Sequence, residues 1–154
     1  LTGKCKGWMD KETKRTGSVA ELAVSAKLVS LGYNVSIPFG ELPYDIVAEK
    51  GGKLIRVQVK SATLSKYGSY RCSLTHGSGS IKTKYTKDAC DLMVLYAPYS
   101  QDYADIPDDG FYVIPVKALM KKNAYHATLH PSGMGKGNRK ICKWEEFRDG
   151  WEGI

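Results

Sequence analysis

A glycine pair between two strand-like runs constrains this sequence more than any other feature. Residues 44–49 and 54–60 are rich in apolar and β-branched residues, and Lys50-Gly51-Gly52-Lys53 separates them. Because glycine accepts the positive φ angles that a tight turn requires, this pattern predicts a β-hairpin. With Gly51 and Gly52 as the two turn residues, Lys50 pairs with Lys53 and the register of both strands follows.

That register sorts the side chains of the hairpin into two groups. Alternation along each strand places an apolar set on the face toward the core, namely Ile46, Ala48, Ile55, Val57 and Val59. Asp45, Gln58 and Lys60 share the opposite face, with Asp45 and Gln58 as direct cross-strand neighbours. A slip of one residue would expose the apolar set and scatter the polar one, so both patterns support the same register.

The polar group at the end of the hairpin suits the hydrolysis of a phosphodiester. The Asp45 carboxylate, the Gln58 side-chain carbonyl and a backbone carbonyl near Val59 are oxygen ligands of the kind that Mg²⁺ or Mn²⁺ prefers. Lys60 could hold a water molecule and stabilise developing negative charge. These residues therefore predict a metal-dependent site for phosphodiester hydrolysis.

Other elements of the chain follow from periodicity and from helix signals. Ser18 followed by Glu21 has the spacing of a capping box, and apolar residues at helical spacing predict a helix over residues 19–31 that Gly32 ends. Further signals predict strands at 33–38, 69–75, 91–97 and 111–116 and a short helix at 116–122.

The order of these elements predicts one α/β domain over residues 1–154, with a mixed central sheet flanked by helices. We expect a basic N-terminal arm at 1–16, a core at 16–120 and a C-terminal extension at 121–154. The extension contains a glycine-rich basic stretch at 132–139.

The distribution of charge favours a polyanionic partner, and double-stranded DNA is the expected one. The net charge is +7, and Lys and Arg gather at 4–15, 82–87, 117–122 and 136–143. An ordinary solvated surface is the alternative explanation for each basic residue. The candidates for contact with DNA are Lys14, Arg15, Ser18, Ser61, Lys82, Lys84, Tyr85, Lys87, Lys136 and Arg139.

The cysteines and the apolar stretches bear on the compartment. No apolar run is long enough to cross a bilayer, and the first residues lack the apolar region of a signal peptide, so we expect a cytoplasmic or nucleoid protein that is not secreted. In a reducing compartment the four scattered cysteines are expected to be free thiols. They are Cys5, Cys72, Cys90 and Cys142.

A zinc site can also be imagined in the C-terminal part of the chain. His126 and His130 have the spacing of one helical face, and Cys142 follows them. The site is disfavoured because Pro131 follows at once and no second cysteine is suitably spaced.

Two short motifs and a helical glutamate resemble the PD-(D/E)XK nuclease superfamily. The motifs are Pro43-Tyr44-Asp45 and Gln58-Val59-Lys60, preceded by Glu21. In this superfamily the helical Glu, the hairpin Asp, the next acidic or amide residue and the Lys form the active site. The resemblance implies a restriction-endonuclease-like fold, catalytic roles for Glu21, Asp45, Gln58 and Lys60, and a metal ion held by Glu21, Asp45 and Gln58.

Gln58 departs from the usual Asp or Glu, and three explanations suit it. The site could be an active variant, a degenerate site in a domain that only binds, or the result of a Glu→Gln change made to trap a complex. We favour the active variant because Glu21, Asp45 and Lys60 all remain. Gln at this position also resembles the group I intron homing endonucleases of the superfamily.

Three functions are therefore open for this chain. The leading hypothesis is a metal-dependent DNA endonuclease of the homing or intron-associated type, acting as a homodimer or larger oligomer because two strands must be cut. A second is a structure-specific nuclease, since residues 16–21 also resemble the opening helix of archaeal Holliday junction resolvases. The third is a catalytically inactive DNA-binding subunit that keeps the nuclease fold.

Overall fold

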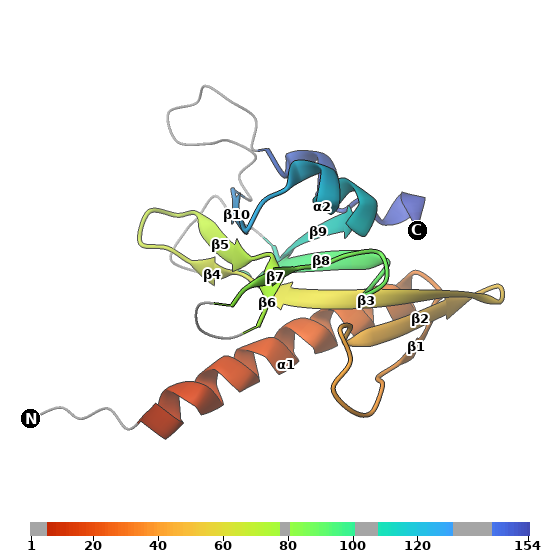
Figure 1. Ribbon diagram of the computed structural model, residues 1–154, viewed down its shortest axis with the longest axis horizontal. Coiled ribbons are helices and arrows are strands. Elements are labelled where there is room, and N and C mark those ends of the chain that lie inside the picture. The colour runs from red at the N-terminus through yellow and green to blue at the C-terminus, as the bar shows by residue number, and fades with distance from the viewer. Residues whose placement is uncertain (1–5, 78–80, 101–107, 131–142) are drawn as a thin grey trace, which may run out of the picture.

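A mixed sheet of five strands forms the centre of the molecule (Figure 1). The computed structural model describes residues 6–77, 81–100, 108–130 and 143–154, with side chains from residue 12 onward. The strands, in spatial order, are β1 (Asn34–Ser36), β2 (Ile46–Lys50), β3 (Lys53–Ser61), β8 (Leu92–Ala97) and β9 (Gly110–Pro115). β3 and β8 run parallel, and the other neighbours are antiparallel.

Helices cover both faces of this sheet (Figure 1). α1 (Lys6–Ser30) packs Ala20, Val24 and Leu28 against one face, where they join the buried side chains of β2 and β3. α2 (Val116–Lys122) follows β9 and packs Val116 and Leu119 into the cluster on the other face. No helix in the described part of the chain is long and apolar enough to cross a membrane.

Two smaller sheets complete the second face. β4 (Thr63–Leu64), β5 (Tyr70–Ser73) and β10 (His126–Leu129) form a three-stranded sheet in the order β10-β5-β4. β6 (Thr75–His76) and β7 (Thr83–Lys84) pair as a short hairpin. Near the C-terminus, the 3-10 turns η1 (Glu145–Phe147) and η2 (Trp151–Gly153) hold Trp144 and Trp151 against the body of the protein, and both are buried.

The predicted hairpin and its register are confirmed. Lys50 pairs with Lys53, Ala48 with Ile55, and Ile46 with Val57. Gly51 and Gly52 form the turn with φ angles of 60° and 79°, values that favour glycine. All five apolar residues assigned to the core face are buried. Local turn chemistry and a period of two residues were therefore sufficient to place this element.

The first helix begins much earlier than predicted. α1 starts at Lys6, so most of the predicted basic arm is helical, and Ser18 lies inside the helix instead of capping it. Its hydroxyl donates to the carbonyl of Lys14 at 3.2 Å. No proline interrupts residues 6–17, and Lys, Arg, Glu and Met in this stretch are good helix formers, so the helix continues through Gly17.

The imagined zinc site loses the helical spacing on which it rested, and the two buried cysteines of the described residues are free thiols, as expected. His126 lies on a strand, where residues four apart do not converge as they do on a helix. Among the described residues no three His, Cys, Asp or Glu side chains group as metal ligands. Cys72 and Cys90 are buried thiols, and burial raises their pKa values to about 12 and about 11. Cys5 and Cys142 lie outside the described residues.

Candidate active site

The site forms where β3 extends beyond the end of its neighbour β2. β2 begins at Ile46, opposite Val57, whereas β3 continues to Ser61. The edge of β3 beyond Val57 therefore needs other hydrogen-bond partners on that side. Asp45, the residue just before β2, supplies them: its N–H donates to the Val57 carbonyl at 2.9 Å, and its Oδ2 accepts from the Val59 N–H at 2.8 Å. This pairing holds the Asp45 carboxylate against the open edge of the sheet.

Gln58 contacts both Asp45 and the backbone of Val59. Its Nε2 lies 2.5 Å from Asp45 Oδ2 and 3.0 Å from the carbonyl oxygen of Val59, and the residue is only 6% exposed. One polar amino group thus bridges two oxygen atoms that belong to different segments of the chain. The predicted proximity of Asp45 and Gln58 is confirmed by this contact.

Glu21 reaches the site from α1. Burial raises its pKa, and the nearby charge of Asp45 raises it further. The pKa of Asp45 is also raised, because its burial outweighs the effects of the Val59 N–H, the Lys60 charge and Gln58. Since α1 continues well before residue 21, the capping role that the sequence offered for Glu21 does not apply. The raised pKa values of these two carboxyl groups show that the site favours a proton, and a bound cation would relieve the same repulsion.

Lys60 lies on the other side of the group, above an aromatic ring. Its Nζ is 5.2 Å from the ring centroid of Tyr85, and it forms no ion pair within 4.0 Å with any described carboxylate. Tyr85 is 4% exposed, and His76 packs against it with ring centroids 5.0 Å apart. Burial raises the pKa of Tyr85, while the Lys60 ammonium acts in the opposite direction.

The placement of Tyr85 corrects one prediction. The sequence suggested a surface contact with DNA, but the ring is enclosed in the core and faces Lys60. Strand-end aromatic residues are often amphipathic, and here the apolar body of the ring found more burial inside the fold than a surface position would give. Tyr85 therefore supports the position of Lys60 through the contact between its ring and the Lys60 ammonium.

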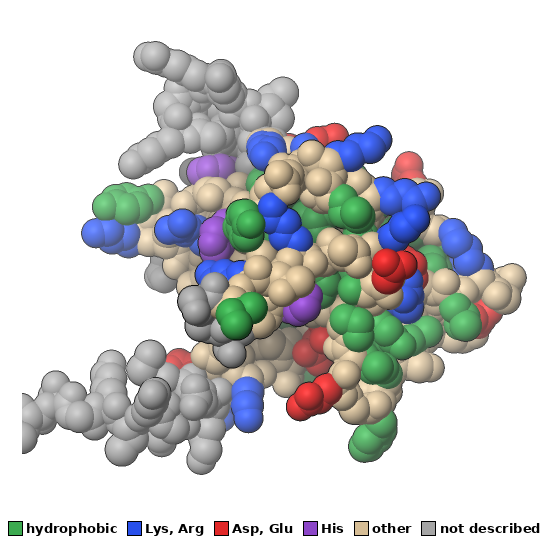
Figure 2. Space-filling model, in the orientation of Figure 1, with side chains coloured by type: hydrophobic (Ala, Val, Ile, Leu, Met, Phe, Trp, Pro, Cys, Tyr) green, Lys and Arg blue, Asp and Glu red, His purple; other side chains and the backbone are tan. Residues whose placement is uncertain are grey.

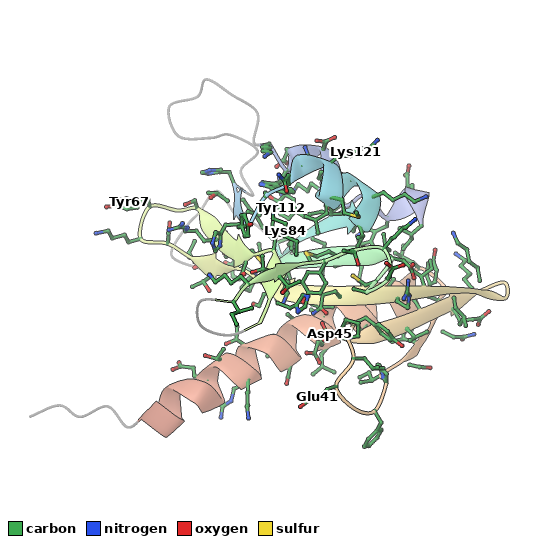
Figure 3. The ribbon with its side chains drawn as sticks, viewed as in Figure 1. Glu41, Asp45, Tyr67, Lys84, Tyr112 and Lys121 are labelled. Carbon is green, nitrogen blue, oxygen red and sulfur yellow. The ribbon has the colours of Figure 1, made fainter. Side chains whose placement is uncertain are left out.

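These residues open into a cleft of about 550 Å³. One wall comes from α1 and the other from the end of β3 and the start of β4, and Asp45 lies beside α1 (Figure 3). Most of the residues that line the cleft are polar. The lining consists of Glu12, Thr13, Thr16, Gly17, Glu21, Asp45, Gln58, Val59, Lys60, Ser61 and Thr63. All four residues predicted to be catalytic line this one cleft.

The predicted DNA contacts fall into several places. Ser61 lines the cleft, and its buried hydroxyl has no hydrogen-bond partner among the described residues. Lys84 is already engaged, because its Nζ lies 2.5 Å from Asn123 Oδ1 and 4.0 Å from the ring centroid of Tyr125. The residues that are exposed on the surface are Lys14, Arg15, Ser18, Lys82 and Lys87. Lys136 and Arg139 lie outside the described residues.

Sequence reasoning missed the α1 wall of the cleft. Thr13, Thr16 and Gly17 line it, and Thr63 faces them from β4. Because the helix was predicted to begin at residue 19, nothing placed these residues on the same surface as Glu21. The signal that could have found them is the unbroken run of helix formers before Gly17.

Comparison with known proteins is consistent with this arrangement. A family model described as PD-(D/E)XK endonuclease matches residues 11–149. The chain is also similar to a solved structure, the bacterial homing endonuclease I-Ssp6803I, with 26% sequence identity, a TM-score of 0.72 and coverage of 90% of each chain. None of the curated proteins compared with the chain matches it. The mixed α/β fold, with its central sheet between helices, is therefore one that a homing endonuclease shares.

Proposed function

The chain belongs to the PD-(D/E)XK endonuclease family, and from this premise we propose that it is a metal-dependent DNA endonuclease of the homing type. The observation that carries the proposal is the convergence of Glu21, Asp45, Gln58 and Lys60 in one cleft. The family supports a nuclease, and the similarity to a homing endonuclease supports the finer assignment. We propose a cytoplasmic or nucleoid-associated location, because DNA is the proposed substrate.

The donor atoms of the site fit a divalent cation. Asp45 Oδ2 and the Val59 carbonyl oxygen both contact the Gln58 amino group, which carries partial positive charge. Rotating the amide would present Oε1 in its place and complete an all-oxygen set with Glu21, which is the set that Mg²⁺ or Mn²⁺ prefers. When bound, such an ion would neutralise phosphate charge and lower the pKa of a coordinated water.

The remaining chemistry falls to the side chains around the cleft. Lys60 keeps its ammonium free of ion pairs with the described carboxylates, so it can hold a water molecule or stabilise charge that develops on the phosphate. The Val59 N–H holds the Asp45 carboxylate in place through Oδ2, and Asp45 lines the cleft. Glu21 lines the cleft from α1, from where it could hold the cation or orient the attacking water.

Cutting both strands of a duplex requires two such sites, so we propose a homodimer or a larger homo-oligomer. The described residues of one chain form one cleft that contains Glu21, Asp45, Gln58 and Lys60. Double-stranded DNA is the proposed substrate, and the net charge of +7 supports binding to a polyanion.

The test is cleavage of DNA with and without metal. Supercoiled plasmid carrying sequence from the gene's own locus and a synthetic four-way junction are incubated in Mg²⁺, in Mn²⁺ or in EDTA. We expect metal-dependent cutting of the plasmid, reduced to background in Asp45→Ala. Preferential cutting of the junction would instead identify a resolvase. Binding without any cutting, unaffected by metal, would identify an inactive DNA-binding subunit.

A matched control separates loss of the site from loss of the fold. Glu49→Ala removes a carboxylate from the same hairpin, where Glu49 contacts Asn34 and the turn at Gly52 outside the cleft. It should cut like the wild type. Gln58→Glu tests the active-variant explanation, because it adds a charge to the cation site and should preserve or increase the rate.

A further inference from the structure

The three-stranded sheet presents an outer face whose residues have no role in the cleft chemistry. Along β5 and β10 burial alternates strictly, so Tyr70, Cys72, Ala127 and Leu129 point into the core. The alternate residues are exposed, and they are Arg71, Ser73, His126 and Thr128. This face is therefore polar and exposed, and it lies directly over the core that supports it.

The face is continuous with the cleft. Thr63 on β4 pairs with Arg71 on β5, and Arg71 pairs with Thr128 on β10, which forms a straight row across all three strands. Ser73 and His126 form a second row beside it. Thr63 also lines the cleft that contains Asp45 and Lys60. A duplex with its backbone in the cleft would therefore extend over this sheet.

The charge of the surrounding chain favours an anionic partner here. Residues 61–87 and 110–144 contain no Asp or Glu, but they contain five and seven Lys or Arg residues. β4, β5 and β10 all come from these two segments. On the face shown in Figure 2, Lys, Arg and His side chains gather over β4, β5 and β10, and acidic side chains lie elsewhere. The segments that form this sheet are therefore basic, which favours the approach of phosphate groups.

The residue types on the face favour contact with bases over contact with phosphates alone. The Arg71 side chain forms no hydrogen bond or ion pair with the described residues, and Thr, Ser and His residues share the face with it. The major groove of B-DNA admits a two-stranded β-ribbon, and a guanidinium fork can pair with the two acceptors of guanine. Hydroxyl groups of Ser and Thr can also form hydrogen bonds with base edges, so the side chains beside Arg71 are compatible with contact to bases.

We propose that the outer face of β4, β5 and β10 reads base edges in a DNA duplex, with Arg71 as the central contact. The proposal rests on the proposed function, since it needs a DNA substrate, and it assigns sequence selectivity to a surface that adjoins the cleft. Tyr67, at the tip of the β4–β5 turn, points away from the body of the protein at the end of this face (Figure 3). Lys66 lies over its ring at 5.0 Å, so the tip also combines a cation with an aromatic ring.

The first part of the test locates the duplex without requiring catalysis. The photoreactive residue p-benzoylphenylalanine replaces His126 on the outer face, or Lys53 at the tip of the β2–β3 hairpin, which lies at the opposite end of the molecule (Figure 1). Each protein is irradiated with labelled mixed-sequence duplex DNA in EDTA. We expect cross-linking from position 126 and none above background from position 53.

Cleavage and cross-linking separate the two proposals. Cutting of plasmid by the wild type without cross-linking from position 126 would overturn the base-reading face and leave the nuclease intact. Cross-linking without cutting would support the face and remove the nuclease assignment. Absence of both would remove both.

The second part tests whether bases or phosphates are recognised. Duplexes that the wild type prefers are selected from a randomised pool, and their affinity is compared with that of unselected duplex. Arg71→Lys keeps the charge but loses the fork, so we expect it to reduce this preference about tenfold while binding unselected duplex as before. Lys53→Ala is the control and should leave the preference unchanged. The proposal would be overturned if both Arg71→Lys and Arg71→Ala kept the preference for the selected duplexes. It would also be overturned if Arg71→Lys bound like the wild type and Arg71→Ala lost affinity equally for selected and unselected duplexes.

Discussion

In the metal-free protein, burial destabilises the charged form of the Asp45 carboxylate. Its pKa is raised by burial, although the Val59 N–H, Lys60 and Gln58 all favour the charged form. Glu21 adds a second carboxylate with a raised pKa. A site that binds a cation is expected to look like this before the cation arrives, because the same burial that disfavours the charge strengthens its attraction to a metal.

The raised pKa of Asp45 predicts a dependence of stability on pH. A carboxyl group whose pKa is raised in the folded state contributes stability below its unfolded pKa, and this contribution is lost as pH rises through the folded pKa. We therefore expect Asp45→Asn to have a higher thermal midpoint than the wild type at pH 7 without metal, and the difference to vanish in acid. Calorimetry across pH measures it.

Glu49→Gln is the control for this prediction. Hydrogen bonds from Asn34 and Gly52 lower the pKa of Glu49, so its contribution has the opposite sign and is lost as pH falls. This variant should show no gain at pH 7. A lower midpoint for Asp45→Asn at pH 7 would mean that the hydrogen bonds from Val59 and Gln58 outweigh the cost of burial.

The contact between Lys60 and Tyr85 predicts an effect on rate that is separate from binding. Tyr85→Leu removes the ring beneath the ammonium, so we expect the cleavage rate to fall about tenfold to a hundredfold with little change in DNA affinity. Tyr85→Phe keeps the ring and should lose less. Single-turnover cleavage and a binding assay in EDTA measure the two quantities.

Tyr112→Phe controls for the loss of a buried phenol, because Tyr112 is fully buried on β9 and does not line the cleft. It should cut like the wild type after correction for folded protein. An unchanged rate in Tyr85→Leu, with the fold intact by circular dichroism, would contradict a role for Tyr85 in positioning Lys60.

Among the elements, α1 combines support of the sheet with one wall of the cleft. Ala20, Val24 and Leu28 bury one face of the helix, while Gly17 and Glu21 line the cleft. Gly17 lies in the helix interior, where a glycine weakens the helix, and a Cβ added there would meet no atom within 4 Å. The fold therefore does not require a glycine at this position, and the close approach of a substrate would explain it.

Gly17→Ala should raise the free energy of unfolding by about 0.5–1 kcal/mol, because alanine loses less backbone entropy in a helix. Urea unfolding measures it. Gly32→Ala is the control with the opposite sign, since Gly32 ends α1 with a φ of 84° that strains other residues. If Gly17 makes room for DNA, Gly17→Leu should lower cleavage while keeping the fold; unaffected cleavage in that variant would contradict this role.

At the scale of the whole molecule, α1 also carries an apolar stripe that faces away from the core. Val19, Leu22 and Val29 are 49%, 64% and 57% exposed, and with Ala26 they repeat at intervals of three and four residues. This spacing is typical of a helix that packs against another helix. In the homodimer that we propose, the second copy of the chain would cover the stripe with the same stripe of its own.

Leu22→Glu should therefore convert a dimer into a monomer, which light scattering after size exclusion would detect. Leu54→Glu is the matched control, because Leu54 is 66% exposed on the hairpin and lies outside the stripe. It should remain dimeric. A wild type that is monomeric at micromolar concentration, or a dimer that survives Leu22→Glu, would contradict this surface.

Local sequence determined the hairpin, its register and the neighbourhood of Asp45, Gln58 and Lys60. A glycine pair and a period of two residues encode these features within about twenty residues of chain, so long-range packing was not needed to infer them. The same local logic placed the strand that contains β5 and the short helix α2. It failed at the start of α1, where a plausible cap at Ser18 competed with a run of helix formers.

Only the tertiary structure decided which distant segments meet this hairpin. Glu21 reaches Asp45 because α1 packs on one face of the sheet, and Tyr85 reaches Lys60 because its ring is buried on the other. One row of the three-stranded sheet contains Thr63, Arg71 and Thr128, and about sixty residues separate β5 from β10. The local sequence of β10 does not indicate with which strand it pairs. Periodicity reports which face of an element is buried, whereas the choice of neighbour depends on the packing of the complete core.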